Sequence, residues 1–186
     1  MDSEHRQLAE RLQQKNEYAE GPFRYVVGEL NGNQVILTQC GIGKVNAAVG
    51  AAELIRRYAP DCIISTGVAG GIDATLRVAD VVASSRLVYH DVYCGNDGTG
   101  DRFVEDKAEL ASIKQHFPDG MAVDMESAAL AHVCHLYGVA FISFRIVSDT
   151  PGAHADNFSQ YQDFWGTMAQ RSFQATWSFL STLPHE

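Results

Sequence analysis

The pattern of hydrophobic and polar positions at the N-terminal end predicts a helix followed by a hairpin. Residues 2–15 carry two leucines four positions apart among charged side chains, which is typical of a surface helix with a narrow apolar stripe. Apolar runs at 23–30 and 34–40 flank an Asn-Gly-Asn sequence at 31–33. Because Asn and Gly tolerate the positive φ of a tight turn, these two runs are predicted to form antiparallel strands.

Beyond the hairpin, apolar runs alternate with helical patterns, which indicates an α/β protein. The run at 61–67 is almost continuously apolar and ends in glycine, as expected of a parallel strand that is buried on both faces. The pattern predicts one or two further strands within 76–93, strands at 121–125 and 139–149, helices at 44–59, 109–117 and 126–138, and a long C-terminal helix from Asn157. No internal repeat or linker interrupts this order, so residues 1–186 are predicted to form one domain.

Composition and charge narrow the functions that fit this pattern. The 186 residues are 46% hydrophobic and 20% charged, which is typical of a globular enzyme, and the formal net charge of −9 disfavours contact with phosphate backbones. The sequence has no cluster of Lys and Arg and no apolar stretch near the roughly 20 residues that span a bilayer. We therefore expect neither a nucleic-acid nor a membrane partner. The polar start MDSEHRQ is unlike a signal peptide, so a cytoplasmic location is expected.

The cysteines are interpreted as reduced thiols, because they stand far apart and form no CxxC pair. They are Cys40, Cys62, Cys94 and Cys134. His132 and His135 would share a helical face next to Cys134, so a metal site is the alternative interpretation. It is disfavoured because no complementary ligand pair stands elsewhere in the sequence. No metal and no cofactor is predicted.

Candidate chemistry lies at the carboxyl ends of the predicted strands, where ligands of α/β sheets usually bind. Four polar strand ends qualify, namely 41–44, 66–71, 124–127 and 145–149. The glycine-rich end at 66–71 matches neither a dinucleotide nor a P-loop motif, and its glycines fit a conformational role as well as a ligand-binding one.

Two carboxylates at these ends are the better candidates for catalysis. Glu126 and Asp149 each follow an apolar strand directly. The alternative for the first of these ends is structural, because Asp124 or Ser127 could cap the helix that follows. On the motifs alone, the sequence indicates a hydrolase or transferase with two carboxylates and names no substrate.

Four segments follow one another in this order along the chain, namely CGIGKVNAA (40–48), IISTGVAGG (63–71), AVDMESAALAHVC (122–134) and FRIVSD (144–149). Together they resemble the 5′-methylthioadenosine/S-adenosylhomocysteine nucleosidases of the nucleoside phosphorylase superfamily. The likeness covers nearly the whole chain, and the combination is far more specific than any one segment. It implies a three-layer α/β/α fold around a twisted mixed β-sheet, a homodimer, and hydrolysis of the bond between adenine and ribose in both substrates, with 5′-deoxyadenosine as a further candidate.

The resemblance assigns catalytic roles to three residues. Glu4, in MDSE, matches the general base that activates the attacking water. Asp149 matches the acid that protonates N7 of adenine while the ribose approaches an oxocarbenium ion, a task that near neutral pH requires a raised pKa. Arg145 matches the residue that helps to hold the water and the ribose side.

The resemblance also assigns substrate contacts. Glu126 matches the carboxylate that holds the ribose 2′- and 3′-hydroxyls, with Met125 beneath the sugar, and Ser148 supports Asp149. Phe103 matches the ring that stacks on the purine, and the backbone of Val104 would contact its hydrogen-bonding edge. Tyr161 or Phe158 would close the alkylthio pocket. The remaining predicted substrate-binding residues are Ile42, Val68, Ala69, Gly70 and Asp124.

Two features of the resemblance bear on the reaction. Asp149 rather than Asn suits a 6-aminopurine, because a protonated Asp donates to N7 while its other oxygen accepts from the amino group. The phosphate loop of related phosphorylases has no counterpart near the N-terminus, so water is the expected nucleophile. The alternatives are a futalosine hydrolase or purine nucleoside phosphorylase, and, in another class, a nucleoside-binding protein without turnover.

The sequence also departs from the family pattern in two places. Family members have a first β-strand ahead of the stretch that matches MDSE, and several tens of additional residues where GNDGTG stands at 95–100. Those interior residues include a strand and a loop that lines the neighbouring subunit's alkylthio pocket. Loss of a core strand would expose apolar surface and unpaired edges, which favours omission of interior residues over a natural truncation.

Overall fold

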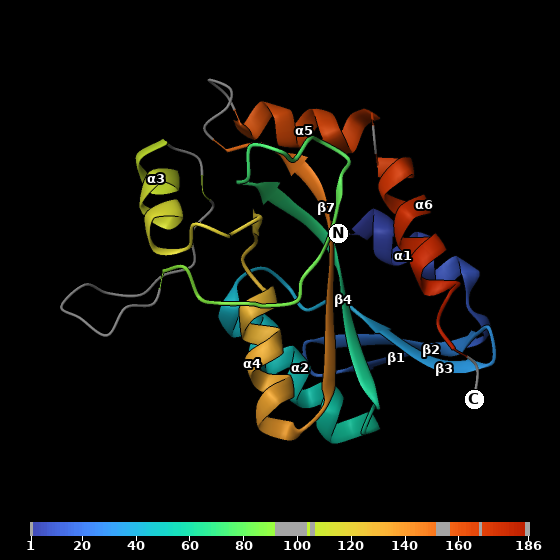
Figure 1. Ribbon diagram of the computed structural model, residues 1–186. Coiled ribbons are helices and arrows are strands. Elements are labelled where there is room, and N and C mark those ends of the chain that lie inside the picture. The colour runs from blue at the N-terminus through green and yellow to red at the C-terminus, as the bar shows by residue number, and fades with distance from the viewer. Residues whose placement is uncertain (1, 92–103, 105–106, 152–156, 168, 185–186) are drawn as a thin grey trace.

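Two β-sheets and six helices account for the described part of the computed structural model, which comprises residues 2–91, 104, 107–151, 157–167 and 169–184 (Figure 1). The helices are α1 (Asp2–Arg11), α2 (Lys44–Tyr58), α3 (Lys107–His116), α4 (Ser127–Tyr137), α5 (Asn157–Thr167) and α6 (Ala169–Leu180). The strands are β1 (Gln13–Glu20), β2 (Phe23–Leu30), β3 (Asn33–Thr38), β4 (Cys62–Gly71), β5 (Val81–Ala83), β6 (Ala122–Val123) and β7 (Ala140–Asp149).

The larger sheet is mixed and has the strand order β5-β7-β4-β6. β4 and β7 run parallel, with Cys62 opposite Ala140 at one end and Gly70 opposite Asp149 at the other. β5 and β6 pair antiparallel to β7 and β4, respectively. The parallel central pair places the carboxyl ends of β4 and β7 side by side, so the polar residues that follow both strands meet at one edge of the sheet.

Helices cover both faces of β7, which confirms the predicted α/β class with helical layers around a mixed sheet. On one face, small residues let α2 and α4 pack closely together, and Phe141 of β7 lies against them. On the other face, Phe144 and Ile146 pack against Phe164 of α5, and Phe144 stacks on Phe179 of α6 with ring centroids 4.6 Å apart. In Figure 1, α2 and α4 lie beside the lower half of β4 and β7, and α5 lies across the carboxyl end of β7.

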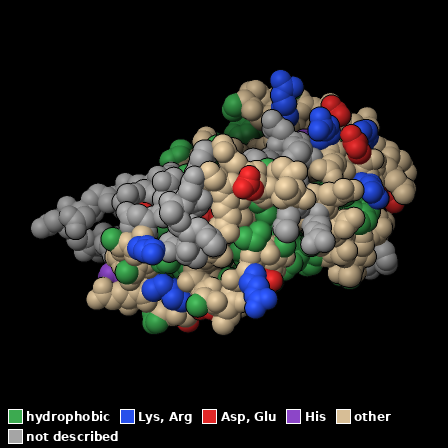
Figure 2. Space-filling model, turned by 90° about the horizontal axis from the view of Figure 1, so that it is seen from above, with side chains coloured by type: hydrophobic (Ala, Val, Ile, Leu, Met, Phe, Trp, Pro, Cys, Tyr) green, Lys and Arg blue, Asp and Glu red, His purple; other side chains and the backbone are tan. Residues whose placement is uncertain are grey.

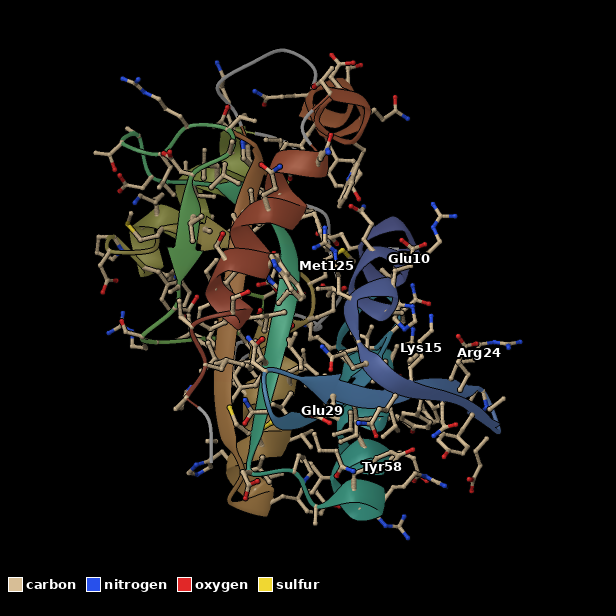
Figure 3. The ribbon with its side chains drawn as sticks, turned by 90° about the vertical axis from the view of Figure 1, so that its right-hand side faces the viewer. Glu10, Lys15, Arg24, Glu29, Tyr58 and Met125 are labelled. Carbon is tan, nitrogen blue, oxygen red and sulfur yellow. The ribbon has the colours of Figure 1, made fainter. Side chains whose placement is uncertain are left out.

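The smaller sheet contains the predicted hairpin. β2 and β3 pair antiparallel, and Asn31 and Gly32 have φ values of 50° and 78°, as the tight primed turn requires. The helix predicted at 2–15 ends at Arg11, and β1 follows it as an edge strand that pairs with β2. Every side chain of β1 is exposed, so no apolar alternation could have revealed it. Figure 3 shows this sheet projecting away from the four-stranded sheet, with Lys15, Arg24 and Glu29 on it.

Three other boundaries differ from the prediction. The strand predicted at 61–67 continues through the glycines to Gly71, and most of its side chains are half-buried rather than buried. Within the described residues β6 pairs with β4 only at Gly70 and Gly71, so the rest of that edge has no strand beside it there. The region 76–93 contributes only the three-residue β5 to the described structure. The long C-terminal helix is replaced by two helices, α5 and α6.

Candidate active site

Asp149 occupies the carboxyl end of β7 and is almost completely enclosed, with 2% of its surface exposed. The Ser148 hydroxyl donates a hydrogen bond to Oδ1 over 2.7 Å, and it also lies 3.4 Å from the carbonyl oxygen of Ala69. Burial raises the pKa of Asp149 above its ordinary value, and the Ser148 hydrogen bond opposes this only in part. The strand end therefore carries a carboxyl group that holds its proton at a higher pH than an exposed aspartate does.

Gly70 and the start of α5 shape the surroundings of this carboxyl group. A Cβ at Gly70 would lie 2.8 Å from Cγ of Pro151 and 3.4 Å from Oδ2 of Asp149, so only glycine fits without displacement. Gln160 of α5 accepts the backbone N–H of Thr150 over 2.9 Å and so ties α5 to the residue after Asp149. Sequence reasoning missed Gln160, because a lone amide on a helix carries no motif.

Glu126 contacts the glycine loop at 41–43, which brings together two of the polar strand ends that the sequence singled out. The backbone N–H of Gly43 donates to Oε1 of Glu126 over 2.9 Å. Gly41 and Gly43 have φ values of 78° and 87°, which a residue with a Cβ rarely adopts. The Asn46 side chain donates to the carbonyl of Ile42 over 2.6 Å and holds this loop closed, while the Ile42 side chain is exposed.

Arg145 is buried and contacts Asp124 and Ser127, which lie on either side of Met125 and Glu126 in the sequence. Its Nε donates to Oδ2 of Asp124 over 3.2 Å, and its Nη2 lies 2.9 Å from the hydroxyls of both Ser65 and Ser127. A Cβ at Gly67 would approach Nη1 to 3.0 Å, so that glycine makes room for the guanidinium group. The contacts recorded for Arg145 are thus with the protein interior. Its predicted contact with water and ribose stays a prediction.

Asp124 acts as a cap for α4, the structural alternative that the sequence left open. Its Oδ1 accepts the backbone N–H groups of Glu126 and Ser127 over 2.8 and 2.6 Å. Burial opposes ionisation of Asp124, but the Arg145 cation and these hydrogen bonds outweigh it and lower the pKa. Asp124 is therefore a mostly enclosed carboxylate that joins the start of α4 to β7.

Glu4 is buried in the first turn of α1, with 7% of its surface exposed. The hydroxyl of Ser172 on α6 donates to its Oε1 over 3.4 Å. The contact is long for a hydrogen bond and connects Glu4 to α6. The role of Glu4 as general base stays a prediction.

The predicted purine and alkylthio contacts are only partly covered by the structure. Phe103 and the Phe158 side chain lie outside the described residues. The Val104 side chain is buried against Ile72 and Ile113. The predicted contact with the purine edge involves the backbone of Val104 and stays a prediction. Tyr161 is half-buried, with its ring edge-on to Trp165. Ala69 is buried beside Gly70, whereas the Val68 side chain packs into the core against β7 and α5.

Met125 borders a small cavity between the start of α2 and the segment at 88–91. The cavity has a volume of about 20 Å³, which suffices for one water molecule. Lys44 and Asp91 line it and form an ion pair with an N–O distance of 2.7 Å. Figure 3 shows Met125 within the body of the molecule. A larger groove of about 310 Å³ lies between α1 and α6, and none of the predicted site residues lines it.

Charges on the side that faces the viewer in Figure 2 are mixed in sign, with acidic and basic side chains next to one another toward one end.

Among the described residues, no group of three His, Cys, Asp or Glu side chains is arranged to hold a metal ion. Burial raises the pKa of the Cys134 thiol to about 11, which disfavours the thiolate that a metal would need. In the same part of the chain, no helix has the length and hydropathy needed to cross a membrane.

Comparison with known proteins gives the family. The family model described as the phosphorylase superfamily matches residues 1–99 and 91–181. The chain is 34% identical to the 5′-methylthioadenosine/S-adenosylhomocysteine nucleosidase of Hydrogenovibrio crunogenus over 213 aligned positions, which cover 92% of each protein. It is 32% identical to the nucleosidase of the same name from Staphylococcus haemolyticus, covering 98% of this chain and 97% of that protein.

A solved structure agrees with these relatives. The Neisseria meningitidis nucleosidase in complex with methylthio-immucillin-A superimposes with a TM-score of 0.88 at 32% identity, covering 98% of this chain and 96% of that one. The alignment of 213 positions exceeds the 186 residues of this chain, so the Hydrogenovibrio protein carries interior residues that this sequence lacks. The two matches to the family model overlap at residues 91–99, close to 95–100, where the sequence analysis expects this chain to lack residues that family members have. The chain belongs to the 5′-methylthioadenosine/S-adenosylhomocysteine nucleosidases, within the phosphorylase superfamily.

Proposed function

We propose that this chain hydrolyses the N-glycosidic bond of 5′-methylthioadenosine and of S-adenosylhomocysteine and releases adenine. The observation that carries the proposal is the buried carboxyl group of Asp149, whose pKa burial raises, at the shared edge of β4 and β7 in a chain of this family. Such a group holds its proton to a higher pH than an exposed aspartate does, which is what a general acid working near neutral pH requires.

In the proposed reaction Asp149 gives its proton to N7 of adenine. The purine then leaves with the electron pair of the glycosidic bond, and the ribosyl group approaches an oxocarbenium ion. Water adds to C1′, and Glu4 takes a proton from that water. The match of MDSE to the family's catalytic stretch and the enclosed position of Glu4 in α1 support this role.

The sugar would be held from the α4 side. Glu126 would bind the 2′- and 3′-hydroxyls, Met125 would lie beneath the ring, and Arg145 would support the ribose side. The Gly43 N–H that fixes one oxygen of Glu126 supports this assignment, because it orients the carboxylate before substrate arrives. Phe103 and the Val104 backbone would contact the purine, and Ile42 and Tyr161 would border the alkylthio group.

A homodimer is part of the proposal. Ile42 is 75% exposed, Val45 72% and Val49 53%, and together they form an apolar surface at the start of α2 beside the candidate site. Apolar residues that lie together on a surface mark contact regions more often than isolated ones do. Light scattering should give a dimer mass, and Val45→Lys should shift it toward the monomer. A monomer at every concentration would refute the proposal.

We also propose a cytoplasmic location, which is supported by the polar start of the sequence.

The first experiment measures base release from 5′-methylthioadenosine, S-adenosylhomocysteine and inosine, each with and without phosphate. We expect adenine from the first two without phosphate and no hypoxanthine from inosine. A requirement for phosphate would indicate a phosphorylase, and cleavage of inosine would contradict the preference for 6-aminopurines that Asp149 implies.

A second candidate is a nucleoside-binding protein without turnover. The observation that favours it is the alignment of 213 positions against 186 residues, because the relative carries interior residues that this sequence lacks. Calorimetric binding of adenine together with no adenine release from either substrate would select this candidate.

A further inference from the structure

A mostly enclosed carboxylate two residues before Glu126 has no role in the proposed reaction. Asp124 lies in the turn between β6 and α4, and its side chain is 12% exposed. Three protein donors engage its two oxygens. The backbone N–H groups of Glu126 and Ser127 bind Oδ1, and Nε of Arg145 binds Oδ2. A carboxylate engaged in this way is poorly suited to contact substrate directly.

The hydrogen bond from the Glu126 N–H to Asp124 affects how the Glu126 side chain is oriented. Glu126 is the N-cap residue of α4, yet its own side chain forms no capping hydrogen bond. Its backbone N–H is held by Asp124, and its side chain receives the N–H of Gly43. The carboxylate of Glu126 is therefore oriented from two directions, once through the main chain and once through the side chain.

The remainder of the network keeps Asp124 itself in place. Arg145 spans from Asp124 to the hydroxyls of Ser65 and Ser127, and the Ser127 hydroxyl lies 2.9 Å from that of Ser143. Ser127, Ser143 and Arg145 are all buried. Buried polar networks of this kind have few alternative arrangements, because each broken contact would leave a polar group without compensation.

We propose that Asp124 is a positioning residue that acts through Glu126 and sets the affinity for the ribose part of the ligand. The inference rests on the proposed function in one respect, the assignment of the ribose hydroxyls to Glu126. It assigns Asp124 no contact with the substrate and so replaces the direct substrate contact that the sequence suggested.

The test compares a ligand with ribose and a ligand without it. Adenine and 5′-methylthiotubercidin are titrated calorimetrically into the wild-type protein and into Asp124→Ala. The second ligand lacks the purine N7 and so avoids protonation and cleavage. Asp124→Ala should weaken methylthiotubercidin at least about ten-fold, the order of one hydrogen bond to a charged group. Adenine affinity should change less than about two-fold. An equal loss for both ligands, or no loss for either, would overturn the proposal.

A double-mutant comparison tests whether the effect passes through Glu126. If it does, Asp124→Ala in a Glu126→Ala background should weaken methylthiotubercidin no further. Additive losses would mean that Asp124 acts independently. Both readouts are equilibrium affinities, so they decide the matter even if the protein cleaves no nucleoside and the proposed function fails.

A conservative variant guards against simple misfolding. Asp124→Asn keeps a carbonyl oxygen for the two N–H groups but presents an amide to Arg145. It should retain more ribose affinity than Asp124→Ala does, and equal losses in the two variants would refute a role through the backbone of Glu126. The control is Asp119→Asn, which breaks an exposed ion pair with Arg86 away from the site and should leave both affinities unchanged.

Discussion

Replacement of Asp149 by Asn tests the proposed proton donor most directly. The two side chains have nearly the same shape, so the enclosed site at the end of β7 should remain packed. The amide has no proton of suitable acidity to give to N7. Loss of a general acid slows enzymes about 10²- to 10⁴-fold. We expect kcat for adenine release from 5′-methylthioadenosine to fall by that factor while adenine binding stays close to that of the wild type.

The free energy of unfolding of the same variant should not fall with its activity at alkaline pH. The folded-state pKa of Asp149 lies above its unfolded value because burial dominates, so the stabilisation linked to its proton is present at low pH and is lost as pH rises through the folded pKa. Above that pKa the wild type contains a buried carboxylate that, within the described part of the chain, accepts a side-chain hydrogen bond from Ser148. Asp149→Asn should therefore be at least as stable as the wild type at pH 8 and should lose this advantage on acidification.

Two measurements together decide the case. Adenine release is followed from pH 5 to 9, and urea unfolding is measured across the same range. The wild-type rate should fall as pH rises through the pKa of Asp149, and the residual rate of Asp149→Asn should lack this alkaline limb. A variant that turns over within ten-fold of wild type would refute the assignment of Asp149. A marked loss of stability at pH 8 would refute the argument from burial.

Three further variants follow from the same structure. Ser148→Ala removes the hydroxyl that partly opposes the raised pKa of Asp149, so the alkaline limb of the pH–rate profile should move to higher pH, and a move to lower pH would contradict this. Gly70→Ala brings a Cβ to 2.8 Å from the Pro151 ring, and urea unfolding should report a loss of about 1–3 kcal/mol from overpacking, whereas unchanged stability would disprove the close contact. Gly138→Ala, at a φ of 70° with no atom within 4 Å of the added carbon, should cost about 1 kcal/mol of stability at unchanged kcat, and a change in kcat would show that this helix end matters for catalysis.

Much of the fold and of the site followed from local patterns in the sequence. The hairpin at 31–33 was predictable because its turn needs residues that tolerate positive φ. The sequence marked Glu126 and the glycine loop as two polar strand ends. Their contact joins the two sheets, because β3 belongs to the smaller sheet and β6 runs antiparallel to β4, so strand order did not predict it. Strand β7 followed from its apolar run, and its length agrees with the prediction to within one residue.

Backbone pairing and lone polar partners left no comparable signal. β1 is polar and exposed along its length and is held by hydrogen bonds to β2, which the side-chain pattern does not encode. Ser65 carries no signal in the sequence, and Ser127 was noted only as a possible helix cap, yet both bind Arg145. A signal for Ser143 existed, because residues two apart on a strand share a face and Ser143 lies two positions before Arg145. It could be interpreted only once α4 was known to cover that face.

A bulge at the end of β7 explains why the side chains of Arg145 and Asp149, four positions apart, lie in different environments. In a regular strand Arg145 and Asp149 would present their side chains to the same face. Here Val147 pairs with Ala69 and Asp149 pairs with Gly70, so Ser148 is an extra residue that has no opposite number on β4. One inserted residue reverses the alternation, which is how a bulge redirects a side chain near a site. Arg145 thus reaches the interior toward α4, whereas Asp149 lies against Gly70 and the start of the segment that leads to α5. No residue type in RIVSD demands the bulge. It depends on how β4 and β7 pair, and so the separate placement of the cation and the acid could be learned only from the structure.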